Sequence, residues 1–401
     1  MRKAILAFVI LGSMVSGSAF AQSAADVQAS VDNLSDVLAK DIATRWKWKG
    51  DFRFRNENIT QQYNPVDRNR DRIRVRLSAT AAVNDNTKVE VGFTTTENGD
   101  ARSGNQTLGD ANSKKALDLD LAYVEWQPNA LAKVTLGKMK YPWVTTSSYF
   151  FDKDVNPEGA AVALNHAPTG IFANVFATDL IERSSAVDTR LVGYQIGMKN
   201  RLNDDSNMTV AVGYFNHKAV KNQTVTQATI NGVFGNTTKS SGCAAGASCL
   251  AYDYDVVNAL AEVNTKVAGL PATLVVDWAK NDKAPKFKNA LAYGVTLGKA
   301  SLPGSWEVGY LHQKVEKDAL FGQWVDSDFG GGNTESQGHA FRAAYQVSKG
   351  WKANATYFVN ETNINVPSAV AIVTPPATLA TMKMISNRGY NRLQLDLNYA
   401  F

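Results

Sequence analysis

Five arginines stand at alternate positions in two short stretches of the chain. Arg53 and Arg55 lie in the first stretch, and Arg72, Arg74 and Arg76 lie in the second. Guanidinium groups stay charged at physiological pH and bind carboxylates and phosphates through paired hydrogen bonds. If the two stretches are neighbouring strands, the five side chains share one face and form a positively charged wall that attracts anions.

Two aspartates, Asp118 and Asp120, alternate in the same way on a later stretch. Placed opposite part of the arginine wall, they create a transverse field that orders water and dipolar solutes. In a second interpretation the arginines pair with carboxylates and only brace the fold. The sequence leaves both interpretations open.

The C-terminal segment shows which elements position these charges. From Arg392 to Phe401, leucines and aromatic residues occupy one face, and polar residues with one alanine occupy the other. This alternation continues over ten residues, which is long enough for a tilted strand to cross a bilayer and longer than most strands of soluble sandwiches.

The same pattern recurs along the chain and predicts sixteen strands. We place them at residues 46–55, 72–81, 88–97, 117–126, 133–139, 159–164, 171–177, 189–199, 208–217, 253–264, 272–281, 289–299, 305–316, 337–347, 351–361 and 392–401. Glu125 falls on the apolar face of its strand, where we expect a membrane rim. The predicted fold is all-β, a transmembrane antiparallel barrel with a polar lumen, because a charge that faces lipid at the midplane costs about 2 to 4 kcal/mol.

The connectors between these strands alternate between short and long, as the turns and external loops of outer-membrane barrels do. The long ones include Asn56–Asp71 and Lys140–Glu158. In many sixteen-stranded barrels the third external loop folds inward and narrows the pore, so Asp152, Asp154 and Glu158 are candidates for a constriction. Their spacing resembles a calcium loop only weakly, because Pro157 replaces the glycine of the sharp turn. We therefore predict no metal site.

The first residues predict export. Arg2 and Lys3 precede an apolar run of about a dozen residues and the small-x-small motif Ala19-Phe20-Ala21, so we expect a signal peptide over 1–21. Without Arg2 and Lys3, the 42 basic and 37 acidic residues of the chain become 40 and 37, a net charge of +3 that gives no indication of nucleic-acid binding. We expect the bacterial outer membrane as location, with outer-membrane lipid as neighbour and the barrel over 45–401.

Residues 22–44 follow a different period. Val27, Val31, Leu34, Leu38 and Ile42 are spaced by three or four positions, which predicts a short amphipathic helix. This helix could form a periplasmic coiled coil between protomers, plug the lumen, or remain a frayed tail. The stripe is too short to decide among them.

Cys243 and Cys249 are the two cysteines of the chain, and both lie in a Gly-, Ala- and Ser-rich stretch without strand character. Outside the cytoplasm this spacing predicts a disulfide that closes a loop tip. Catalysis has little support, because none of the four histidines lies in a nucleophile motif and no Gly-x-Ser-x-Gly occurs. We predict neither an enzyme nor a cofactor.

Several motifs resemble those of the putative porins of Gram-negative bacteria. The resemblance is strong over roughly the first 160 residues and architectural beyond them, and it rests on Arg45-Trp46-Lys47, Arg68–Leu77, Asn105–Asp110 with Ser113-Lys114-Lys115, Leu117–Tyr123, Gly137-Lys138-Met139 and Asn156–Gly159. It implies an outer-membrane pore, a homotrimer in most cases, whose solute is unassigned. We therefore expect passive diffusion of small hydrophilic solutes, with a weak preference for anions. The alternatives are a structural or adhesive barrel without an open pore, and a barrel enzyme.

Overall fold

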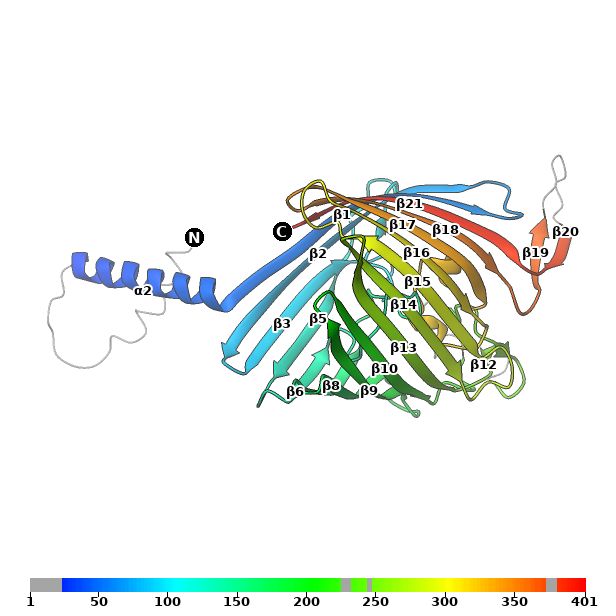
Figure 1. Cartoon of the computed structure of the whole chain (residues 1–401), viewed down its shortest axis with the longest axis horizontal. Coiled ribbons are helices and arrows are strands. Elements are labelled where there is room, and N and C mark those ends of the chain that lie inside the picture. The colour runs from blue at the N-terminus through cyan, green and yellow to red at the C-terminus, as the bar shows by residue number, and fades with distance from the viewer. Residues whose placement is uncertain (1–23, 225–231, 244–246, 373–380) are drawn as a thin grey trace.

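The computed structural model describes residues 24–224, 232–243, 247–372 and 381–401. The predicted signal peptide, residues 1–21, lies outside them. The predicted N-terminal helix is present as α2 (Ala24–Arg45), which runs directly into the first strand and lies outside the barrel (Figure 1). No described helix is long and apolar enough to span a membrane.

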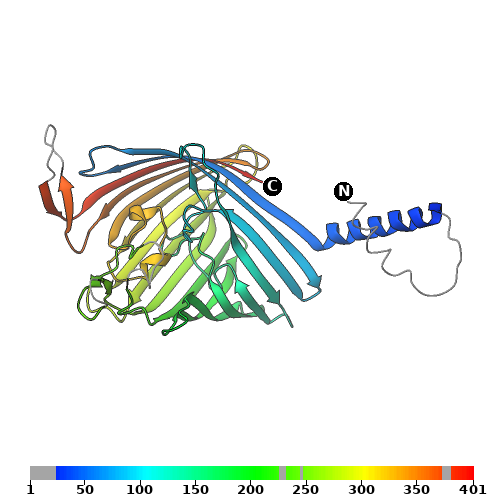
Figure 2. The same cartoon turned by 180° about the vertical axis from the view of Figure 1, so that it is seen from behind.

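Among the described residues, sixteen antiparallel strands form one closed barrel, as predicted (Figures 1 and 2). Each strand pairs with the next, and the last strand pairs with the first between Asp51–Gln61 and Tyr390–Ala400. The strands are β1 (Trp46–Gln61), β2 (Arg68–Asn84), β3 (Thr87–Thr95), β5 (Leu117–Trp126), β6 (Ala132–Lys138), β7 (Glu158–His166), β8 (Ile171–Ile181), β9 (Thr189–Asn203), β10 (Ser206–Lys218), β13 (Tyr254–Val267), β14 (Leu270–Asn281), β15 (Asn289–Gly298), β16 (Trp306–Val315), β17 (Ser336–Ser348), β18 (Trp351–Thr362) and β21 (Arg388–Ala400).

The remaining elements are short. The strand β4 (Gln106–Thr107) adds to β2, and two small hairpins lie in loops, β11 (Thr238–Lys239) with β12 (Cys249–Leu250) and β19 (Ser368–Ile372) with β20 (Thr381–Ile385). Two 3-10 turns, η1 (Gly322–Trp324) and η2 (Phe329–Gly331), lie between β16 and β17. Cys243 and Cys249 form the predicted disulfide, with 5.8 Å between their Cα atoms.

The alternation of each strand separates the outer wall from the lumen. In β21, Leu393, Leu395 and Leu397 are exposed on the outside, whereas Arg392 and Gln394 are buried on the inside. Apolar side chains therefore face outward where lipid would lie, and polar side chains face inward. This confirms the membrane-barrel pattern expected from the sequence.

The predicted connector Asn56–Asp71 is largely strand instead of loop. Asn56 pairs with Asp71 and Asn58 with Asn69, so the β1–β2 hairpin continues as far as Ile59 opposite Arg68. These residues are polar on both faces of the hairpin. A hairpin that projects beyond the apolar band has water on both sides, so it lacks the apolar alternation by which the sequence analysis recognised strands.

A β-bulge at Asp120 explains the position of Glu125. Gly92 of β3 pairs with Leu121 and Phe93 pairs with Leu119, so Asp120 has no partner residue. The extra residue reverses which face the following side chains occupy. Glu125 consequently pairs with Lys88 and Lys133, 3.4 and 3.1 Å away, on the lumen side, so our expectation that it lies on the apolar face was wrong.

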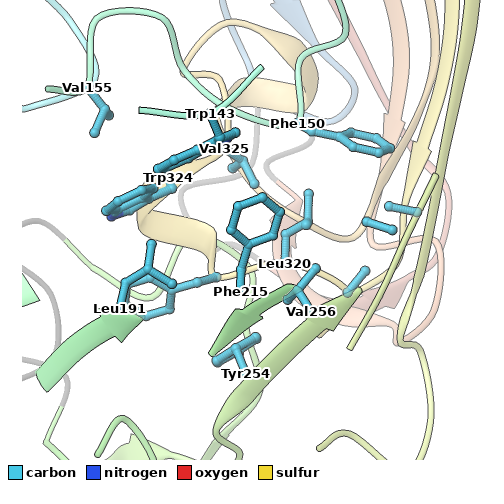
Figure 3. Close-up of a cluster of buried hydrophobic side chains, with 14 of the residues drawn as sticks. Trp143, Phe150, Val155, Leu191, Phe215, Tyr254, Val256, Leu320, Trp324 and Val325 are labelled. Atoms are coloured by element: carbon cyan, nitrogen blue, oxygen red, sulfur yellow. The ribbon is translucent and has the colours of Figure 1, made fainter. Parts of the chain in front are cut away.

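Two loops fold into the barrel and fill part of its lumen. Loop 139–157, between β6 and β7, and loop 316–335, between β16 and β17, bring Trp143, Phe150 and Trp324 against inward side chains such as Phe215 and Tyr254 (Figure 3). Large apolar side chains in a loop are stable only when they are removed from water. The loops thereby narrow the lumen, and two water-accessible cavities remain beside the arginine wall.

Candidate functional site: the charged channel

The structure brings the five predicted arginines together. Arg53 of β1 lies opposite Arg74 of β2, and Arg55 lies opposite Arg72. Arg76 is the next inward residue of β2 and lies opposite Asp51 of β1. Because all of these positions share the inward face of two neighbouring strands, the wall exists as the sequence predicted.

Most of the wall is paired with carboxylates. Arg55 donates two hydrogen bonds to Asp396 of β21, at 2.6 and 2.9 Å. Asp51 accepts hydrogen bonds from Arg74 at 2.9 Å and from Arg76 at 2.6 Å. The structure therefore supports the bracing interpretation for these three arginines.

The two remaining arginines of the wall, Arg72 and Arg53, have weaker carboxylate contacts. Arg72 lies 3.4 Å from Glu97 and donates to the carbonyl of Asn105 at 3.0 Å. Arg53 donates to Asn398 at 2.9 Å and lies 3.7 Å from Asp396. Of the five arginines, Arg53 therefore lies farthest from its nearest carboxylate.

A further arginine, Arg392 of β21, completes the wall and was not among the predicted site residues. It forms an ion pair with the fully buried Glu57 and a second with Asp328 at 2.7 Å. Arg70 contacts Glu57 from the other side at 2.5 Å. Removing one member of such a buried group costs about 3 to 5 kcal/mol, because the remaining charge loses its partner.

The two predicted aspartates lie near the wall in different ways. Asp118 pairs in register with Thr94, which pairs with Arg76, so it stands in the same row of the lumen face. Asp120, at the bulge, accepts a hydrogen bond from Asn156 of loop 139–157 at 2.5 Å. Asp120 thus holds the loop beside the wall.

Loop 139–157 presents its acidic tip to the arginines. Asp154 lies 3.3 Å from Arg76 and 3.7 Å from Arg74. Burial alone would raise the pKa of Asp154, but Arg74, Arg76 and Arg53 more than offset this effect and lower it. Asp154 is therefore a charged contact between the loop and the wall.

Asp152 serves a different purpose. Its carboxylate accepts the backbone N–H of Ser327 at 2.8 Å and that of Asp154 at 2.9 Å. Burial, followed by the nearby Asp326 and Asp154, raises the pKa of Asp152 well above its ordinary value. This residue joins the two inward loops.

Glu158, the third predicted constriction residue, does not belong to the loop tip. It is the first residue of β7, is exposed, and shares the parity of the outward Val162 and Leu164. Its carboxylate lies 2.7 Å from Lys138. The prediction was wrong because β7 begins one residue earlier than expected, at Glu158 itself.

Loop 316–335 supplies a second acidic tip that the sequence analysis missed. Asp328 lies 3.2 Å from Arg55, and burial of its carboxyl is outweighed by Arg392 and Arg55, which lower its pKa. Burial and the neighbouring Asp328 raise the pKa of Asp326 to about 7. Aromatic residues in a long connector, here Phe321 and Trp324, were the available sign that this loop is buried.

Two water-accessible cavities follow the wall. The larger, of about 830 Å³, lies against the wall beside the β15–β16 turn, and the smaller, of about 380 Å³, lies between the wall and the two acidic tips. Arg74, Arg76 and Glu307 line both cavities. The two cavities are therefore adjacent along the wall, and we call the smaller one, which lies between the wall and the loop tips, the narrow cavity.

The described residues contain no cluster of three or more His, Cys, Asp or Glu that could hold a metal ion. The cavities along the wall are lined by arginines, lysines and carboxylates, groups that bind and orient solutes. The chemistry this arrangement offers is electrostatic.

A closed sixteen-stranded barrel with inward loops and a charged channel defines the porin class of fold. Residues 50–245 match the model of the family described as a putative porin, which confirms the resemblance found in the sequence motifs. Among curated proteins, none matches the chain.

Solved structures show the same fold. OprB of Pseudomonas putida, in its high-pH structure, is 11% identical, with 92% of this chain and 97% of that chain covered and a TM-score of 0.58. OmpF of Salmonella typhi, in complex with daunomycin, is 9% identical, with 89% and 97% covered and a TM-score of 0.50. At such identities the likeness concerns the barrel alone.

Proposed function

We propose that this chain is an outer-membrane porin through which small hydrophilic solutes diffuse passively. The observation that carries the proposal is the pair of adjoining cavities, which share Arg74, Arg76 and Glu307 along the polar wall of a closed barrel. A lumen lined by charge is wetted readily, and passive passage needs no other machinery.

A weak preference for anions is part of the proposal. The arginines of the wall produce a local positive potential, and the low-dielectric barrel concentrates it. Asp51, Asp154, Asp328 and Asp396 offset much of this charge through their ion pairs. The preference is therefore expected to be modest.

Conductance in planar bilayers tests the proposal directly. Purified protein should give discrete channels, and liposomes that contain it should swell in uncharged sugars of low molecular mass. The reversal potential in asymmetric KCl should have the sign of a weakly anion-preferring pore. Protein that inserts in folded form but never conducts would contradict the function.

A barrel with a plugged lumen is the competing candidate, because the apolar cluster around Trp143, Phe215 and Trp324 fills part of the interior. Such a protein would serve a structural or adhesive role and would show no conductance. A barrel enzyme would hydrolyse lipid in the same vesicles, which a fatty-acid release assay detects.

Assembly and location complete the proposal. The family resemblance implies a homotrimer in the outer membrane, exported after removal of residues 1–21. Light scattering in detergent measures the oligomeric mass, and N-terminal sequencing of protein from outer-membrane fractions should begin at Gln22. A monomeric mass would contradict the proposed trimer but would leave the proposed pore function standing.

A further inference from the structure

The cationic side chains that lack a carboxylate partner among the described residues, and can therefore bind a solute, are not those of the predicted arginine wall. Arg342 of β17 and Lys153 of loop 139–157 line the narrow cavity together with the wall arginines. Neither has a carboxylate within 4.0 Å among the described residues, in contrast to Arg55, Arg74 and Arg76. An unpaired cation in a narrow channel is available to a passing anion.

Among the described residues, the Arg342 guanidinium donates no hydrogen bond and is held in place by packing. It pairs in register with Gly309 of β16, and its Nε atom lies 3.4 Å from the position that a Cβ atom of Gly309 would occupy. The guanidinium carbon lies 5.9 Å from the centre of the Tyr149 ring. Packing between a glycine and an aromatic ring fixes the guanidinium, whose five N–H groups suit a bidentate oxyanion.

Lys153 stands between two aspartates that are both engaged elsewhere. Asp152 binds the backbone of loop 316–335, and Asp154 contacts the arginine wall. The exposed ammonium group of Lys153 is left in the cavity, where it and Arg342 repel each other electrostatically. An anion between them would relieve this repulsion.

The larger cavity is also lined by lysines that have no carboxylate partner among the described residues. Lys140, Lys299 and Lys352 line it, and none of them has an ion pair within the described part of the chain. The acidic lining residues without an ion pair there are Glu307 and Asp120. In the narrow cavity Asp152 and Asp326 also lack an ion pair with any described residue, so five such cations face four such carboxyls along the channel. Burial raises the pKa of both Asp152 and Asp326, which favours their neutral forms, so the balance of the available charge is positive.

We propose that Arg342 and Lys153 form a binding subsite for the anionic group, carboxylate or phosphate, of small solutes in the narrow cavity. Lys140, Lys299 and Lys352 extend it as a track toward the larger cavity. The inference rests on the proposed pore function and deepens it, because it names the solute class and moves anion recognition away from the paired wall.

The test is block of single-channel current by added anions in a constant KCl background. The probes are sodium acetate and inorganic phosphate, with acetamide as the uncharged counterpart of acetate. Wild-type channels should be blocked by at least one of the two anions in a saturable manner and not by acetamide. Arg342→Gln and Lys153→Gln should each weaken this block at least tenfold, and Arg342→Lys should retain part of it.

Lys286→Gln serves as the matched control, because Lys286 is exposed in the loop between β14 and β15 and does not line these cavities. Block by acetate alone or by phosphate alone identifies the preferred head group. Conducting channels whose block is non-saturable, or is unchanged in both Gln variants, would overturn the subsite and leave the pore standing. Absence of conductance in wild-type protein would instead overturn the proposed function.

Discussion

Trp143 of loop 139–157 and Trp324 of loop 316–335 stack with their ring planes 4° apart and their centroids 5.7 Å apart. Backbone hydrogen bonds continue the contact, since Asp152 N–H donates to the Trp324 carbonyl at 2.8 Å. The two loops thus form a single inward unit. The width of the channel depends on both of them.

Replacing Trp324 by alanine should loosen this unit. The buried ring packs against Trp143 and Tyr141, and the loss of a buried tryptophan costs about 3 to 5 kcal/mol of packing. We expect larger and noisier single-channel currents, with heat-modifiable migration of the barrel unchanged. Trp306→Ala, on the exposed outer wall, is the control. Equal conductance in wild type and Trp324→Ala would show that the loop unit does not limit the current.

The channel should respond to pH near neutrality. Asp326 has a pKa of about 7, raised by burial and by Asp328, so its carboxyl takes up a proton as the pH falls from 8 to 6. The lumen then loses one negative charge, and the reversal potential should move toward anions. Because the folded-state pKa exceeds the ordinary 3.8, the loop unit also gains stability as the pH falls through 7, and this gain is complete near pH 4.

The variant Asp326→Asn isolates this effect. It should have, at pH 8, the selectivity that wild type reaches at pH 6, and it should lack the transition centred near pH 7. Asp205→Asn, in an exposed turn, should titrate like wild type. A wild-type reversal potential that stays constant between pH 8 and 6 would contradict the assignment.

Loss of the disulfide should make its loop easier to cleave without changing the conductance of the pore. It joins Cys243 to Cys249, next to the small pairing of Lys239 with Cys249. Closing so short a loop contributes about 2 kcal/mol in the chain-entropy view. The double Cys→Ser variant should be cut faster by trypsin at Lys239, while its conductance matches that of wild type. A large loss of conductance would mean that this loop supports the channel.

The sequence was sufficient to predict elements whose pattern is local. The ten-residue alternation of Arg392–Phe401 predicted a membrane strand, and the inward arginines of β1 and β2 followed from the same parity. The bulge at Asp120 could not be predicted, because an extra residue is recognised only against its partner strand.

Long-range contacts set the rest of the site. Asp328 reaches Arg55 across 273 positions of sequence, and Arg102 donates to the carbonyl of Gly332 across 230. No period in either stretch encodes such pairing. The second acidic tip and the unpaired Arg342 therefore emerge only from the folded chain.

The last prediction concerns the wall itself. Replacing Arg72, Arg74 and Arg76 together by glutamine removes the partners of Asp51 and weakens the contacts of Asp154 and Glu97. Those carboxylates would then face the channel, and the reversal potential should shift toward cations. The shift should fade in about 1 M salt, where the screening length is about 3 Å.

Because the triple variant removes buried ion pairs, a milder one is needed in parallel. Arg76→Gln should give a smaller shift in the same direction, because Asp51 keeps Arg74 as a partner; adding Asp51→Asn should reverse the shift by removing that carboxylate charge. Arg201→Gln, at the exposed end of β9 where Arg201 pairs with Asp204 of the following turn, is the matched control. If the folded triple variant keeps the wild-type reversal potential, the wall lies outside the ion path and only braces the barrel.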